Sequence, residues 1–162
     1  GHHGPSAGWL EVIDKVLRAR PVKNALDLGT GSGVLAIAVR KVKKIPVLAT
    51  DIDPVAVRVA RENVKRNGIA SGIRVETAPG FHSPAFREDG PFDLIIANIL
   101  ARPLMKMAPE LGHHLAPGGS VILSGILAAQ RWKVIAAYSG AGMRHLSTIW
   151  RNGWVTMHFT NR

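Results

Sequence analysis

The sequence predicts an α/β protein with a mostly parallel, seven-stranded sheet, helices on both faces and an antiparallel hairpin at the end. Short apolar runs alternate with amphipathic stretches along most of the chain, which is typical of parallel α/β layers. The alternation stops near the end, where two strand-like runs flank Asn152-Gly153, a sequence typical of a tight hairpin. The length of 162 residues is usual for one domain.

Seven short apolar runs have the character of strands, because they are bounded by glycine, proline or polar residues. We expect strands at residues 25–28, 46–50, 73–78, 92–97, 120–124, 143–150 and 154–160. The fifth follows a turn at Pro117-Gly118-Gly119.

Five longer stretches have helical spacing or helix-start residues. We expect helices at residues 6–19, 34–42, 54–67, 104–115 and 127–138. The third has the clearest ends, since Asp53 is placed to cap it, Pro54 fits its first position and Gly68 stops it. Residues 79–91 contain several proline and glycine breaks together with charges, which predicts a loop.

The composition is that of a globular chain with excess positive charge. Hydrophobic residues make up 46% and charged residues 20%, and no apolar run reaches the roughly 18 residues that span a membrane. There is no cysteine, hence no disulfide and no thiolate metal site. Without a secretion signal pattern at its start, we expect a soluble, cytoplasmic protein with no membrane or metal partner. The formal net charge of +10 favours polyanionic neighbours such as nucleic acid, although solvated helix faces explain it equally well.

A glycine-rich segment joins the first expected strand to the next helix. Gly29, Gly31 and Gly33 follow Asp27 there in a G-x-G-x-G pattern, which differs from the G-x-G-x-x-G of dinucleotide-binding loops. Glycines let the backbone approach a ligand, and a helix N-terminus offers free N–H groups and a positive dipole end. The segment predicts a ligand site, in which Asp27 either hydrogen-bonds the loop or reaches an amine of the ligand.

Asp51 ends the second expected strand, 22 positions after Gly29. A carboxylate at this place in an α/β sheet can accept both hydroxyls of a ribose. The alternative is a structural loop carboxylate, as we expect for its neighbour Asp53.

Asn98 ends the fourth expected strand, at the edge where an α/β sheet exposes its ligands. Its amide oxygen can accept a hydrogen bond from an amine and orient the nitrogen lone pair. The alternative is a simple cap at the end of the strand.

Together these motifs resemble class I methyltransferases, whose Rossmann-like sheet ends in an antiparallel hairpin that plain dinucleotide-binding sheets lack. Within that class the chain resembles the ribosomal protein L11 methyltransferase family over essentially its whole length. Asn-Ile-Leu-Ala followed later by Leu-Ser-Gly-Ile-Leu is characteristic of that family. The matching segments are residues 1–4, 26–38, 51–56, 97–101, 103–104, 123–127 and 153–156.

The resemblance implies transfer of methyl groups from S-adenosyl-L-methionine to lysine and N-terminal amines of a large-subunit ribosomal protein, near ribosomal RNA. The product of the cofactor would be S-adenosyl-L-homocysteine. Asn98 would be catalytic, orienting a neutral amine for in-line displacement without a dedicated base. The residues expected to bind the cofactor are Ser6, Asp27, Gly29, Thr30, Gly31, Gly33, Asp51, Ile52 and Asn98.

The beginning of the chain departs from the family in two ways. A family loop ends in two threonines, and here Pro5 and Ser6 stand in their place, so that only Ser6 keeps a hydroxyl. Family members also have a front domain that grips the substrate, and this chain begins at the loop after it. We therefore expect residues 1–162 to form a single methyltransferase domain without that front domain.

Three other functions fit parts of the sequence. An RNA methyltransferase of the same fold suits the positive charge, but enzymes acting on planar nitrogens usually have two prolines and an aromatic where this chain has Ile99 and Leu100. A non-catalytic module that binds a nucleotide or RNA would not need Gly29, Asp51 and Asn98 together. A nicotinamide-dependent enzyme is the third alternative.

The other histidines have simpler explanations than metal binding. His113 and His114 lie near an expected helix end, where they would act as a C-terminal cap pair. His82 falls in the expected loop and would be solvated.

Overall fold

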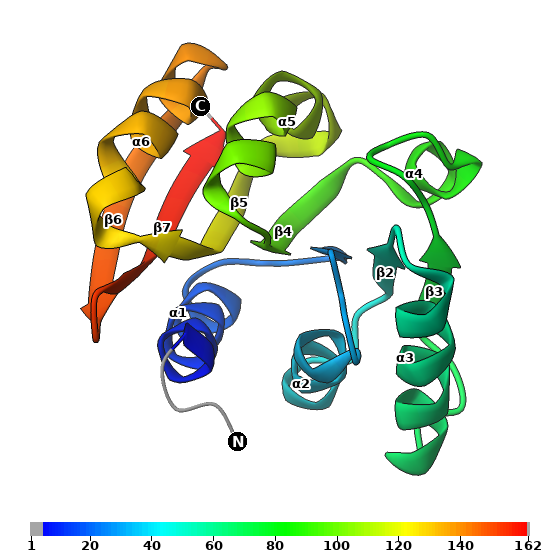
Figure 1. Cartoon of the computed structure of the whole chain (residues 1–162). Helices are drawn as coiled ribbons and strands as arrows, with labels where there is room; N and C mark the ends of the chain where they lie inside the picture. Colours follow the sequence, from blue (N-terminus) through cyan, green and yellow to red (C-terminus); the bar gives the residue numbers. More distant parts are fainter. Residues whose placement is uncertain (1–4, 162) are drawn as a thin grey trace.

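The computed structural model describes the backbone of residues 5–161 and the side chains of residues 9–161. Its centre is one seven-stranded sheet with the strand order β3-β2-β1-β4-β5-β7-β6 (Figure 1). Strands β1 to β5 are parallel, and β7 runs antiparallel between β5 and β6, which confirms the predicted mixed sheet and terminal hairpin. The strands are β1 (Ala25–Leu28), β2 (Val47–Asp51), β3 (Ile73–Thr77), β4 (Phe92–Asn98), β5 (Leu115–Leu127), β6 (Met143–Arg151) and β7 (Trp154–Asn161).

Helices cover both faces of the sheet and give it two hydrophobic cores. Helices α1, α2 and α3 pack on one face, and α4, α5 and α6 pack on the other (Figure 1). Along β4 the side chains alternate between the cores, Ile95 and Ala97 facing α4–α6 while Leu94 and Ile96 face α1–α3. The helices are α1 (Pro5–Ala19), α2 (Val34–Val42), α3 (Pro54–Arg66), α4 (Pro84–Asp89), α5 (Ala101–His114), the short 3₁₀ helix η1 (Ala128–Gln130) and α6 (Arg131–Gly140).

The strand order reverses between β1 and β4. From β1 the chain proceeds outward through β2 and β3, and then returns to the other side of β1 to form β4 and β5. The connections at the carboxyl ends of β1 and β4 therefore diverge, and a crevice forms between them. This topology places a ligand site at the position that the glycine segment and Asn98 predict.

Helix α4 corrects the prediction of a loop over residues 79–91. Ser83 caps the helix by accepting a hydrogen bond from the amide of Ala85 at 3.2 Å, and Pro84 occupies its first turn. Two residues of this helix, Ala85 and Phe86, are buried. This start has the same design as Asp53-Pro54 at α3, but six residues are too few for a helical period to be recognised.

The boundaries of α5, β5 and α6 also differ from the prediction by three residues or more. Helix α5 begins at Ala101 rather than at residue 104, because a proline such as Pro103 is tolerated in a first turn. Strand β5 extends over Leu115–Leu127, with a shift in its pairing to β4 around the predicted turn. Its extension means that α6 begins only at Arg131, after η1, instead of at residue 127.

Within the described residues, no helix combines the length and apolar character required to cross a membrane.

A hydrogen bond from Tyr138 joins α6 to α5, and substitution of Tyr138 tests how much this bond stabilises the fold. The side chain is fully buried and its hydroxyl donates to the carbonyl oxygen of Leu104 at 2.9 Å. Burial raises the pKa of Tyr138, so the hydroxyl stays protonated as a donor. We expect Tyr138→Phe to lower the free energy of unfolding by about 1–2 kcal/mol in urea titrations. The exposed neighbour gives the control, Ser139→Ala, which should change it by less than about 0.5 kcal/mol; equal effects of the two substitutions would contradict this role.

Candidate functional site

A cavity of about 400 Å³ opens at the carboxyl edge of the sheet, at the switch point between β1 and β4. Its volume lies in the range of roughly 300–1,000 Å³ that is usual for small-molecule sites. Residues from the ends of β1, β2 and β4, from the segment after β3 and from the start of α5 form its wall. The wall is largely apolar, with Asp51 and Asn98 as prominent polar residues.

The glycine loop between β1 and α2 depends on two close approaches. Gly29 has a φ of +74°, and a Cβ on it would lie 3.0 Å from Cγ1 of Ile99 at the end of β4. Gly33 has a φ of +84°, and a Cβ on it would lie 3.2 Å from the Cβ of Ala60 in α3. Both conformations favour glycine, and both positions leave no room for a side chain. The loop is therefore pressed between β4 and α3.

Most backbone amides of the loop donate hydrogen bonds within the protein. Those of Gly29 and Thr30 donate to the carbonyl oxygen of Thr50 at 2.9 and 2.8 Å, and that of Gly33 donates to the carbonyl of Thr30 at 3.0 Å. Helix α2 begins after Gly33 without a side-chain cap. An anionic group would thus be met by the open first turn of α2 rather than by these loop amides.

Asp51 ties the glycine loop to the start of α3. Its Oδ2 accepts the amide of Gly31 at 2.9 Å, and its Oδ1 accepts the amide of Asp53 at 3.0 Å. These contacts are those expected of a carboxylate that stabilises a loop. Asp51 also lies on the cavity wall, as a ribose-binding carboxylate would. Each carboxylate oxygen has a second acceptor position, so these contacts leave capacity for ligand hydroxyls.

Asp27 is a buried carboxyl group beneath the glycine loop. Its Oδ2 accepts a hydrogen bond from the Thr30 hydroxyl at 2.7 Å, which is the loop-bonding alternative that the sequence left open. Its Oδ1 is buried without a hydrogen-bond partner among the described residues. Burial raises the pKa of Asp27 to about 6, although the hydrogen bond from Thr30 acts in the opposite direction. A positive group at the site would relieve this cost of ionisation.

Asn98 projects from the end of β4 beside Gly125 of β5. A Cβ on Gly125 would lie 2.9 Å from Oδ1 of Asn98 and 3.1 Å from the carbonyl oxygen of Ile99. Gly125 also has a φ of +81°, so both space and conformation require glycine. Its neighbour Ser124, paired with Asn98 across the strands, has a buried hydroxyl oxygen with no hydrogen-bond partner among the described residues. Gly125 therefore leaves the space that the Asn98 amide occupies.

The predicted residues divide into two groups. The cavity is lined by Gly29, Asp51, Ile52 and Asn98. The glycine loop and the end of β1 contain Asp27, Thr30, Gly31 and Gly33, which do not line the cavity but hold those that do. Ser6 belongs to α1, and its side chain, like residues 1–4, lies outside the described residues.

Sequence reasoning missed several residues of the wall. Ala78, Gly80, Pro103 and Met107 line the cavity from the segment after β3 and from α5. Gly125 was noticed only as part of a family motif, although a glycine inside an apolar strand indicates a close backbone approach. The others have no distinctive local pattern.

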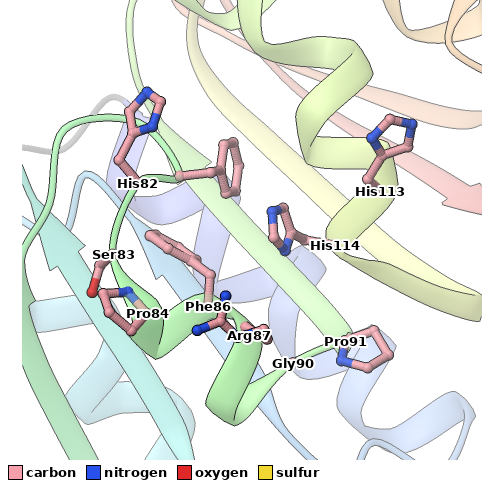
Figure 2. Close-up of a pocket in the computed structure, with 10 residues that line it drawn as sticks. His82, Ser83, Pro84, Phe86, Arg87, Gly90, Pro91, His113 and His114 are labelled. Atoms are coloured by element: carbon pink, nitrogen blue, oxygen red, sulfur yellow. The ribbon is translucent and has the colours of Figure 1, made fainter.

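A second cavity, of about 670 Å³, lies between α4 and the end of α5 (Figure 2). His113 and His114 are the last residues of α5, as predicted, but the His114 ring stacks on Phe81 with centroids 4.7 Å apart. Burial lowers the pKa of His114. In Figure 2 His114 points toward Phe86, while His82 is exposed, as predicted. Across the described residues, no cluster of three or more His, Cys, Asp or Glu side chains is placed to hold a metal ion.

Comparisons with known proteins agree on one family. The model of the ribosomal protein L11 methyltransferase family matches residues 1–162. A protein named ribosomal protein L11 methyltransferase from Rhizobium leguminosarum bv. trifolii is 80% identical over 159 residues, which are 98% of this chain and 54% of the relative. The chain thus spans about half the length of the curated relatives it matches.

Solved structures show the same fold. The ribosomal protein L11 methylase of Lactobacillus delbrueckii subsp. bulgaricus superposes with a TM-score of 0.88 and 33% identity, over 100% of this chain and 80% of that one. An RNA methyltransferase of Salinibacter ruber, solved with S-adenosyl-L-homocysteine, gives a TM-score of 0.70 and 22% identity over 93% of this chain and 90% of that one. At that identity the likeness concerns the fold alone.

The buried Asp27 predicts an unusual dependence of stability on pH in the ligand-free chain. Because its folded pKa of about 6 exceeds the ordinary 3.8, its contribution to stability is fully present below about pH 4 and is lost as the pH rises through 6. Asp27→Asn remains neutral, so its unfolding free energy relative to the parent should rise by about 2 kcal/mol between about pH 4 and pH 7. Denaturant titrations at both pH values measure this difference, and a difference that does not change with pH would contradict the assignment.

Proposed function

The chain belongs to the ribosomal protein L11 methyltransferase family, and on that premise we propose that it is an S-adenosylmethionine-dependent methyltransferase domain whose substrate is ribosomal protein L11. Its acceptors are lysine side chains and the N-terminal amine of that protein. The observation that supports this best is the convergence of Gly29, Asp51 and Asn98, from three strand ends, on one cavity of about 400 Å³.

The residues around the cavity fit this cofactor. Asp51 accepts the ribose hydroxyls, and Ile52, which is 72% exposed, offers an apolar side chain to the adenine. The unpartnered oxygen of Asp27 supplies the negative charge that a cationic cofactor needs nearby. When bound, S-adenosylmethionine supplies a methyl group on a sulfonium and leaves as S-adenosylhomocysteine. The loop residues Thr30, Gly31 and Gly33 hold this arrangement. Ser6, whose side chain lies outside the described residues, stays a predicted cofactor contact.

The acceptor amine is oriented by Asn98. Its Oδ1 accepts an N–H from the amine, so that the nitrogen lone pair faces the methyl group. Gly125 leaves room for this amide, because a side chain there would crowd Oδ1. A lysine amine has an ordinary pKa of about 10.4, and the nearby sulfonium cation together with desolvation on binding would lower it. Catalysis then rests on positioning rather than on a general base.

The substrate assignment follows the names of the relatives, whose function is methylation of ribosomal protein L11. Such a substrate places the enzyme in the cytoplasm and close to ribosomal RNA. The net charge of +10 favours that neighbourhood.

An RNA methyltransferase is the second candidate, supported by the same positive charge. The tip of β4 argues against it, since Ile99 and Leu100 provide no aromatic face for a base. Assays that offer both protein and RNA as acceptors separate the two.

Asp51→Ala tests the cofactor site directly. Loss of a charged acceptor for the ribose hydroxyls should weaken S-adenosylhomocysteine binding roughly ten- to a hundred-fold in isothermal titration calorimetry. The control is Asp53→Ala, which removes the cap of α3 and should lower stability by about 1 kcal/mol while leaving the affinity within about two-fold. Unchanged affinity in the Asp51 variant would disprove the ribose role, and tight binding of NAD instead would disprove the choice of cofactor.

Asn98→Ala tests the reaction. Intact-mass spectrometry of ribosomal protein L11, incubated with this chain and saturating S-adenosylmethionine, should show gains in single-methyl steps. Misplacement of the amine in the variant should slow them about 100-fold. Asn67→Ala, the same change at the exposed residue that follows α3, serves as the control and should retain the parent rate.

The other outcomes of that assay are equally informative. The Lactobacillus delbrueckii methylase, used in parallel, shows that the substrate preparation can be methylated. No gain with this chain, while S-adenosylhomocysteine binds, would contradict protein methylation by this domain alone. Methyl transfer to ribosomal RNA transcripts instead would support the second candidate.

A further inference from the structure

The acidic residues of this protein are distributed very unevenly. All 11 Asp and Glu residues lie at or before Glu110, and none occurs in residues 111–162. That last part contains Arg131, Lys133, Arg144 and Arg151 among its positive residues. It forms β5, η1, α6, β6 and β7, so one whole edge of the sheet carries positive charge without acidic side chains of its own (Figure 1).

Two tryptophans on this edge are exposed. Trp132 in the first turn of α6 is 65% exposed, and Trp150 near the end of β6 is 56% exposed. Arg131 lies between them, its Cζ 4.9 Å from the centroid of the Trp132 ring and 4.6 Å from that of Trp150. The guanidinium also donates to the carbonyl of Ala128 at 2.6 Å. We call Arg131, Trp132 and Trp150 the Trp–Arg–Trp patch.

This patch is ordered before any partner arrives. Cation–π contacts on both sides of Arg131 hold the indoles in place, which reduces the entropy that binding would cost. Indoles that remain more than half exposed after such ordering leave large planar surfaces open to a partner.

The patch lies at the carboxyl ends of the parallel strands, the side of the sheet on which the cofactor cavity also opens. The amide of Ala128 donates to the carbonyl of Gly153 at 2.9 Å, which joins η1 to the turn of the β6–β7 hairpin. Leu127, 44% exposed, precedes η1 at the end of β5, two residues after the Gly125 that contacts Asn98. A partner on the patch would therefore approach the mouth of the active site.

We infer that the Trp–Arg–Trp patch, with Lys133 and Arg151 beside it, is a binding platform for single-stranded RNA. Of the positive side chains in and beside the patch, Arg151 has an acidic neighbour in Glu11 of α1, with 3.9 Å between Nη2 of Arg151 and Oε2 of Glu11. The remaining positive charge complements a phosphate backbone, and exposed indoles provide the flat surfaces on which unpaired bases stack. An acidic peptide would satisfy the charge, but Asp and Glu side chains have no aromatic rings to stack on the indoles. The choice of RNA over DNA rests on the proposed function, since RNA surrounds a ribosomal protein.

Fluorescence anisotropy with a labelled single-stranded oligouridylate tests the platform, without cofactor or methyl acceptor. Binding should weaken steeply with added salt. Trp132→Ala and Trp150→Ala should each weaken it roughly ten-fold, and Trp132→Phe should retain most of the affinity because it keeps a stacking surface. Lys133→Ala should lower the slope of log affinity against log salt by about 0.7. Lys44→Ala, an exposed lysine before β2, is the matched control and should leave both quantities within error.

Thermal unfolding and S-adenosylhomocysteine binding of the variants should equal those of the parent, since both indoles are exposed. The platform is overturned if the parent does not bind RNA. It is also overturned if Lys133→Ala and Lys44→Ala lose equal RNA affinity, or if both tryptophan-to-alanine variants keep full affinity. Competition by polyglutamate as effective as that by RNA assigns the patch to an acidic peptide, and tighter binding of the matching DNA strand overturns the RNA assignment. Because no methyl transfer is measured, these outcomes are independent of the methylation assay.

Discussion

The active edge of this molecule depends on one carboxylate that joins two turns of the chain. Asp51 accepts the amide of Gly31 from the turn after β1 and the amide of Asp53 from the turn after β2. Helix α3 completes the join, since Asn63 donates to the carbonyl of Ser32 at 2.9 Å. The loop therefore cannot relax independently of α3, and its glycines are kept at positive φ by contacts on both sides. The ligand surface is built before a ligand arrives, and this preorganisation favours tight binding.

Two carboxyl groups, Asp27 and Asp51, lie close together at this edge, and their charges repel each other. Asp27 lies under the loop as a buried carboxyl group, one oxygen of which has no partner in the described part of the chain, and this is unfavourable without a ligand. Asp51, nearby, adds a repulsive charge to it. A ligand with a sulfonium and an ammonium group would offset both, whereas the pyrophosphate of a dinucleotide would worsen them. The charge of the site thus discriminates between two cofactor classes that the sheet topology alone does not separate.

Local patterns made the strands, the hairpin and α3 predictable, because alternation, Asn-Gly and Asp-Pro act within a few residues of one another. Helix α4 was missed because it is shorter than the period by which helices are recognised, and its burial comes from Phe86 packing against distant parts of the chain. In the site, Gly29, Asp51 and Asn98 follow from strand ends that converge by topology, whereas Ile52 came from the family resemblance. Gly125 did not follow, since its constraint is the space taken by the side chain of Asn98 on another strand. The burial of Asp27 beneath the loop is also not displayed by the sequence.

The chain separates its chemistry by position. Residues up to Glu110 contain every acidic side chain and all the residues that line the cavity, so the region with the cavity is also the region with negative charge. The remainder supplies Gly125, which leaves room for the Asn98 amide, and then an edge with no acidic side chains of its own. Strand β5 of this remainder joins the two parts, as it pairs with β4 on one side and with β7 on the other. A macromolecule held on the positive edge would therefore be connected to the Asn98 amide through a single strand, so that substitutions on the surface and at the cavity can be made separately.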